Sequence, residues 1–249
     1  MVLHGYREQF RSALKKTTFI ASVLDINTPV ILFDWPGDQD TSLTGYRAAH
    51  DVAAASGTEL AALLTALVRD VQPGRISVVA NSMGAQVVVD AFSILYEQAE
   101  FSDPEVEIMD VVLTAPDVDR DDFDARFKEE IIAIARRLIV YVSSNDRALV
   151  ASRLINRSRR AGESSLGPEQ LPEAESIADL MEAGSDRITL VDVTPVNRTR
   201  NFHNFSLEVP EYYDDLFLRL TNDAYPKSRR VYPIRASSGT VYWVLTRGR

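Results

Sequence analysis

The chain of 249 residues contains no cysteine. That absence excludes disulfide bonds, cysteine-ligated zinc and thiol nucleophiles, and it removes any indication of the redox compartment. Cationic side chains are also under-represented, since 27 Lys and Arg stand against 36 Asp and Glu for a net charge of -9. A chain of this charge repels a phosphate backbone on average, so we expect no nucleic-acid partner.

Long hydrophobic runs and a secretion signal are also missing. The longest apolar stretch, 60–68, is interrupted by Thr65 and followed by Arg69, which leaves it short of the roughly 20 residues that a spanning helix needs. The N-terminus turns polar directly after Leu3, unlike a signal peptide. We therefore expect a soluble, cytoplasmic protein without an integral membrane segment. The 45% of hydrophobic and 25% of charged residues are typical of a folded globular chain.

Short β-branched runs alternate with longer segments of helical spacing, a pattern that predicts the α/β class, with a mostly parallel sheet covered by helices on both faces. The runs are nearly continuous in apolar residues, as expected of strands buried on both sides. We expect strands at 29–33, 76–80, 111–114, 138–142 and 188–193, with 2–3 as the stub of a sixth.

Helices and turns fill the remaining segments. Segment 163–176 has the Ser, Gly, Pro and Glu content of a mobile loop or lid. Two short runs around Gly239 favour a C-terminal β-hairpin. We predict helices at 46–71, 87–95, 149–162 and 212–220, and hairpin strands at 231–234 and 240–245. The main domain would span 1–226, and residues 227–249 would form a hairpin extension packed on it.

The sharpest local pattern surrounds Ser82. A predicted strand runs into Ala80-Asn81-Ser82-Met83-Gly84 and then into a predicted helix. This arrangement is typical of a nucleophile elbow, where the turn is so tight that the residues two before and two after the nucleophile must be small. The serine would then lie at a helix N-terminus, which favours negative charge.

A serine nucleophile needs a base, and the chain has three histidines. His203 follows the last predicted parallel strand, at the carboxyl edge where open α/β sheets place their active sites. His50 lies within a predicted helix, and we interpret it as a surface or packing residue. For the carboxylate, Asp146 after the fourth strand fits best, and Asp117 after the third is the alternative. The order Ser82, Asp146, His203 is that of α/β-hydrolases.

Several blocks are spread from residue 4 to about residue 220. They are His4-Gly5-Tyr6, Phe33-Asp34-Trp35-Pro36, Ala80-Asn81-Ser82-Met83-Gly84, Ala115-Pro116-Asp117-Val118-Asp119, Ser144-Asn145-Asp146-Arg147-Ala148 and Arg160-Ala161-Gly162. Together these blocks resemble a bacterial α/β-hydrolase family catalogued as domain of unknown function 900. The resemblance implies an α/β-hydrolase fold with a Ser-Asp-His triad and no known substrate.

The resemblance also implies roles for further residues. The backbone N–H groups of Met83 and Tyr6 would form the oxyanion hole, and His4 would be a structural part of that loop. Independently of the resemblance, Trp35 lies at the end of the first full strand, where it would either line the pocket or, as we favour, belong to the scaffold. Asn81 occupies a position where the family usually has His, a difference that bears on substrate preference.

The N-terminus is a second departure from the family. The strand that supports the oxyanion loop is reduced to residues 2–3, and no strand precedes it. We expect either upstream residues or a partner chain, such as the second copy in a homodimer, to complete this edge.

The leading hypothesis is a serine hydrolase that cleaves a small-molecule carboxylic ester through an acyl-enzyme, with no cofactor and no metal. Two alternatives stay open. One is an acyltransferase that uses the same three residues, and the other is a non-catalytic binding module on a hydrolase scaffold. In that last case Ser82 would be a small turn residue, Asp146 a helix cap and His203 a loop residue.

Overall fold

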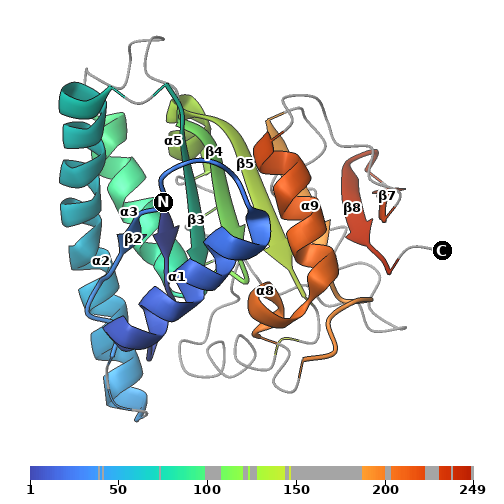
Figure 1. The fold of residues 1–249 in the computed structure, drawn as a ribbon, viewed down its shortest axis with the longest axis horizontal. Coiled ribbons are helices and arrows are strands. Elements are labelled where there is room, and N and C mark those ends of the chain that lie inside the picture. The colour runs from blue at the N-terminus through green and yellow to red at the C-terminus, as the bar shows by residue number, and fades with distance from the viewer. Residues whose placement is uncertain are drawn as a thin grey trace.

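A computed structural model describes most of the chain (Figure 1). The predicted helix 149–162 and the predicted lid 163–176 lie outside the described residues. The described residues are 1–38, 40, 42–72, 74–98, 108–119, 123, 128–143, 146, 187–199, 203–221, 230–236 and 238–247.

One eight-stranded sheet organises the molecule. Its strand order is β2-β1-β3-β4-β5-β6-β8-β7, and every pair is parallel except the β7–β8 hairpin. This confirms the predicted α/β class, the mostly parallel sheet and the C-terminal hairpin. The strands are β1 Val2–Leu3, β2 Leu32–Phe33, β3 Ile76–Asn81, β4 Ile108–Thr114, β5 Ala135–Val142, β6 Ile188–Asp192, β7 Val231–Arg235 and β8 Val241–Leu245.

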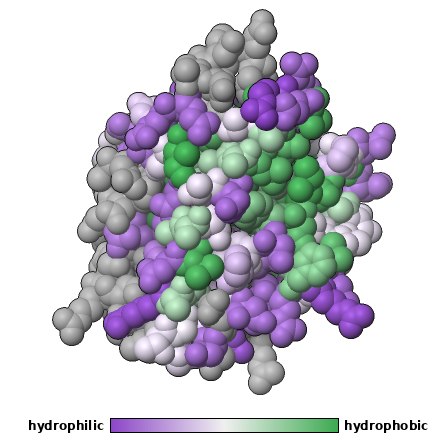
Figure 2. Space-filling model, turned by 90° about the vertical axis from the view of Figure 1, so that its left-hand side faces the viewer, coloured by the Kyte–Doolittle hydropathy of each residue, from purple (hydrophilic) through white to green (hydrophobic). Residues whose placement is uncertain are grey.

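The first two strands are the shortest. The sequence predicts a strand at 29–33, but β2 contains Leu32–Phe33 alone, because its partner β1 offers two residues for pairing. Val30 and Ile31, just before β2, are 40% and 38% exposed. β2 is one of the two edge strands of this sheet, and the surface on the side of β2 and α2 carries a hydrophobic area (Figure 2).

Helices cover both faces of the sheet (Figure 1). α2 packs extensively on α3, which also contacts α5, whereas α1 and α9 meet on the opposite face. The sequence pattern did not predict α1 or α5. The helices are α1 Phe10–Leu24, α2 Leu43–Ala66 with a final π-helical turn Leu67–Val71, α3 Gly84–Tyr96, α5 Lys128–Ile134, α8 Phe205–Glu208 and α9 Pro210–Thr221.

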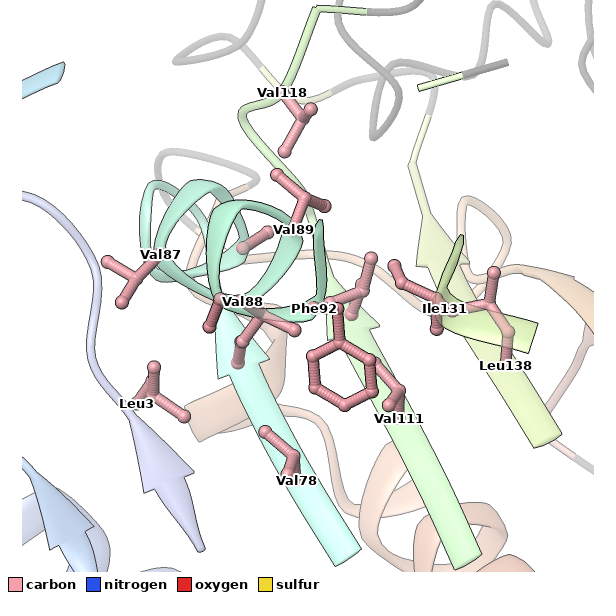
Figure 3. Packing of buried hydrophobic residues seen from close by; sticks show 14 of the residues in the cluster. Leu3, Val78, Val87, Val88, Val89, Phe92, Val111, Val118, Ile131 and Leu138 are labelled. Atoms are coloured by element: carbon pink, nitrogen blue, oxygen red, sulfur yellow. The ribbon is translucent and has the colours of Figure 1, made fainter. Parts of the chain in front are cut away.

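Two apolar cores lie on the two faces of the sheet. On the face of α2 and α3, Val88 and Phe92 of α3 pack against Val78 and Val111 of the sheet (Figure 3). On the other face, the buried cluster includes Val79, Val112 and Tyr212. Because both faces of β3 and β4 are covered, these strands are rigid supports for whatever follows their carboxyl ends.

The 28-residue segment Thr44–Val71 is, by length and composition, apolar enough to cross a membrane, since it contains an 18-residue window with a mean hydropathy of 1.4. It is longer than the apolar stretch 60–68 considered from the sequence, because alanines extend it toward the N-terminus. Ala49, Ala53, Leu60 and Leu64 are fully buried, and the helix packs on α3. A helix packed in the core of a folded domain has the same length and composition, and 33% of the apolar window is buried here.

Candidate active site

Ser82 lies in a tight turn between β3 and α3, as the sequence predicts. Its φ of 53° is in the left-handed region, a conformation that costs a non-glycine residue about 1–3 kcal/mol and persists only where the surroundings impose it. The N–H of Ser82 donates to the carbonyl of Thr114 at 2.9 Å, and its carbonyl accepts from Ala85 at 3.0 Å and Asp117 at 3.2 Å. The turn is therefore fixed from β4 as well as from α3.

Two glycines bring the loop after β1 against this turn. A Cβ added to Gly84 would lie 2.5 Å from the carbonyl oxygen of His4, and one added to Gly5 would lie 3.0 Å from the Cβ of Ser82. Real Cβ atoms essentially never come closer than 3.0 Å to other heavy atoms, so the backbone of the loop can reach the serine only because both residues lack side chains.

The predicted oxyanion donors are placed in this contact region. Met83 is the N-cap residue of α3, and Tyr6 directly follows Gly5. The hydrogen bonds of the described residues use neither of these two backbone N–H groups. The next residue, Arg7, has a φ of 64° and donates its N–H to Gly37 at 2.7 Å, which fixes the loop beyond Tyr6.

His203 and Asp146 are brought together by the fold. The Nδ1 of His203 lies 2.7 Å from the Oδ2 of Asp146, and Asp146 is 0% exposed. Burial alone would lower the pKa of His203, but the hydrogen bond and charge of Asp146, with a smaller effect of Asp117, outweigh burial and raise that pKa. Within the described part of the chain, no hydrogen bond joins the hydroxyl of Ser82 to His203.

The alternative carboxylate, Asp117, lies at the same sheet edge in a different role. Its backbone N–H donates to the carbonyl of Ser82, and its Oδ2 accepts a 2.6 Å hydrogen bond from the hydroxyl of Tyr46. Asp117 is 3% exposed. It is Asp146, not Asp117, whose carboxylate lies within hydrogen-bond distance of His203.

His4 and Trp35 are buried together beneath the loop after β1. Their rings stack with centroids 5.5 Å apart and an interplanar angle of 7°. The indole Nε1 of Trp35 donates to the carbonyl of His4 at 2.8 Å, and the Nε2 of His4 lies 3.0 Å from the Oδ1 of Asp34. Both side chains therefore support the loop that carries Gly5.

Asn81 precedes the serine and faces the opposite side of the sheet from α3. Its Oδ1 accepts a 2.9 Å hydrogen bond from the hydroxyl of Ser206, which ties the end of β3 to α8. His50, which the sequence pattern indicates to be a surface or packing residue and not the base, lies within α2 and is half-buried.

Sequence reasoning missed several polar residues near the site. Tyr46 holds Asp117, and Glu8 and Lys16 form an ion pair beside the loop after β1. None of these belongs to a recognisable motif, and α1, which carries Lys16, was not predicted. Asp192, at the end of β6, is fully buried, and burial raises its pKa to about 6 despite hydrogen bonds from Thr194.

Comparison with known families agrees with this architecture. A family model described as an α/β hydrolase of unknown function (DUF900) matches residues 1–216. The chain belongs to this family. The match ends within α9, before the hairpin of β7 and β8. No curated protein and no solved structure matches the chain. Membership in DUF900 is consistent with the α/β-hydrolase fold of the sheet and its helices.

Proposed function

We propose that the protein is a serine hydrolase that cleaves carboxylic esters, with Ser82 as nucleophile, His203 as base and Asp146 as the carboxylate that orients it. The observation that supports this most directly is the buried 2.7 Å pair of Asp146 and His203. The pair lies at the same sheet edge as a serine in a left-handed turn at a helix N-terminus.

The chemistry follows from these positions. His203 takes the proton of Ser82 as its oxygen attacks the ester carbonyl, and the N–H groups of Met83 and Tyr6 stabilise the oxyanion. When the carbon–oxygen bond breaks, the imidazolium gives its proton to the departing alcohol. Water, activated by the same imidazole, then attacks the acyl-enzyme and releases the acid with return of the proton to Ser82.

Asp146 supports both steps through charge. It stabilises the imidazolium that forms each time His203 accepts a proton, and it holds the ring with Nδ1 toward the carboxylate so that Nε2 can act as base. The raised pKa of His203 is in the direction expected for a histidine beside a buried carboxylate.

The test is hydrolysis of a p-nitrophenyl ester series by the wild type and by Ser82→Ala. We expect the variant to lose about 10³-fold or more in kcat. A matched control is Ser77→Ala, since Ser77 is on the same strand but at its opposite end, where its hydroxyl bonds to Asp110. Equal rates for wild type and Ser82→Ala would overturn the proposal.

The same assay separates hydrolysis from acyl transfer. With an added alcohol, free acid as the sole product supports hydrolysis, whereas the ester of the added alcohol indicates a transferase that uses the same acyl-enzyme.

A further inference from the structure

The first turn of α2 contacts both the loop after β1 and the loop after β4. Tyr46, in this turn, is buried and touches one residue of each loop. Its ring meets the ring of Tyr6 edge to face, with centroids 5.7 Å apart and an interplanar angle of 87°. Its hydroxyl donates a 2.6 Å hydrogen bond to the Oδ2 of Asp117. One side chain therefore connects the two loops that contact the turn of Ser82.

Tyr6 is held against the same end of α2 at a second point. Its hydroxyl donates to the carbonyl of Asp40, which lies just before Ser42, the N-cap residue of α2. Asp40 is itself fixed, because its Oδ1 accepts a 2.7 Å hydrogen bond from the N–H of Ser42 and a Cβ on Gly45 would collide with its carbonyl. Since the N–H of Tyr6 is a proposed oxyanion donor, these contacts help to set the position of that donor.

Asp117 continues the connection to the second proposed donor. Its backbone N–H donates to the carbonyl of Ser82 at 3.2 Å. That carbonyl belongs to the same peptide group as the N–H of Met83. A trans peptide group is planar, and its C=O and N–H point in opposite directions. The hydrogen bond from Asp117 to Ser82 therefore helps to fix the direction of the Met83 N–H.

We propose that Tyr46 is a positioning residue that sets the separation and orientation of the two oxyanion donors, the N–H groups of Tyr6 and Met83. It acts through Tyr6 and Asp117 and not by contact with the substrate. This inference rests on the proposed esterase function of Ser82. A misplacement of about 1 Å can cost about 10²-fold in rate, so a residue that aligns both donors should affect kcat.

Two substitutions separate the two contacts of Tyr46. Tyr46→Phe keeps the ring beside Tyr6 and loses the hydrogen bond to Asp117, whereas Tyr46→Leu loses both. With p-nitrophenyl acetate, kcat should fall about tenfold in Tyr46→Phe and about 10²-fold in Tyr46→Leu. KM should change little, because the donors act on the charge that develops in the transition state.

Inhibition by trifluoroacetophenone distinguishes positioning of the donors from a general loss of stability. The oxygen of Ser82 bonds to the ketone carbon, the serine proton passes to His203, and the ketone oxygen becomes an oxyanion that the two donors bind. The inhibition constant should therefore rise by about the same factor as kcat/KM falls in each Tyr46 variant.

Tyr141 provides the matched control. It is also buried, and its hydroxyl donates a 2.7 Å hydrogen bond to the Oδ2 of Asp215 in α9. Tyr141→Phe thus removes the same kind of hydrogen bond from a different part of the molecule. It should lower the midpoint of urea denaturation but leave kcat and the inhibition constant close to those of the wild type.

Three results would overturn the role of Tyr46. They are a wild-type kcat in a folded Tyr46→Leu, a loss of kcat without a matching rise in the inhibition constant, and equal losses in Tyr46→Phe and Tyr141→Phe. If Tyr46→Leu does not fold, Tyr46→Phe carries the same test with the tenfold effect. Absence of any Ser82-dependent turnover in the wild type would instead overturn the proposed esterase function.

Discussion

The two sides of the candidate site are held in different ways. On the nucleophile side, backbone geometry fixes Ser82 through its left-handed φ and through the close contacts of Gly5 and Gly84. On the acid–base side, a buried pair of polar side chains orients His203 against Asp146. The nucleophile side should therefore be sensitive to added side-chain volume, and the acid–base side to loss of a charge. Substitutions of these two kinds test each side separately.

The largest effect is expected from removing the charge of Asp146. Asp146→Asn keeps the shape of the side chain but no longer stabilises the imidazolium, so kcat should fall about 10³- to 10⁴-fold. The pKa of His203 should fall as well, because its main raising influence is gone. Ester kinetics as a function of pH measures both. A variant with wild-type kcat would show that the pair is structural.

The matching test of the nucleophile side changes volume without changing charge. Gly84→Ala places a Cβ 2.5 Å from the carbonyl oxygen of His4, so the loop after β1 must move away from Ser82. We expect a loss of about 1–3 kcal/mol in the free energy of unfolding, typical of overpacking, together with reduced kcat. Urea denaturation measures the first effect and ester turnover the second.

Gly74→Ala is the control for that substitution, because nothing lies within 4 Å of the added Cβ at Gly74. It should leave both stability and turnover close to those of the wild type. Equal behaviour of the two alanine variants would contradict the close approach at Gly84.

A smaller effect, on stability, is expected at a second buried carboxylate of which one oxygen has no hydrogen-bond partner. Asp192 is as deeply buried as Asp146, but its Oδ2 has no hydrogen-bond partner and burial raises its pKa to about 6. At pH values between the unfolded-state pKa of about 3.9 and the folded-state pKa of about 6, Asp192 binds a proton more fully in the folded protein than in the unfolded chain. Stability should therefore fall as pH rises through this window and then remain level.

Asp192→Asn should remove this slope, and its advantage over the wild type should be larger at neutral pH than near pH 4. Urea midpoints across this range measure it. Asp110→Asn is an informative contrast, since it breaks a 2.7 Å pair with Arg137 and should destabilise the fold. A wild-type slope in Asp192→Asn would show that another group titrates there.

The smallest expected effect concerns charges around His203. Asp117 raises the pKa of His203 and Lys16 lowers it. Because the base works in its neutral form, activity is lost as pH falls through that pKa. Asp117→Asn should move this acid limb of kcat/KM to lower pH by a fraction of a pH unit, and Lys16→Met should move it to higher pH. Shifts of the same sign in both variants would contradict this interpretation.

The sequence predicted the sheet and the places of Ser82, Asp146 and His203 because these depend on local patterns. Apolar runs mark strands that are buried on both faces, as in β3 and β4. Residues with reactive or ionisable side chains follow the carboxyl ends of such strands. The turn at Ser82 also requires small neighbours, which leaves a readable pattern in the chain.

The rest depends on contacts that leave no local pattern. α1 was missed because Phe10, Leu14 and Phe19 are 59%, 45% and 46% exposed, while its buried positions include Ala13 and Thr17. Without α1, the ion pair of Glu8 with Lys16 could not be foreseen. β2 is shorter than its apolar run because the number of residues in its partner strand sets its length.

The most direct test of the central claim is covalent labelling by a fluorophosphonate, read by mass spectrometry of the intact protein and of its peptides. We predict one adduct per chain, located on Ser82 and absent from Ser82→Ala, with slower labelling in Asp146→Asn. A folded wild-type protein that acquires no adduct, or one labelled at another residue, would contradict the assignment of Ser82 as the nucleophile.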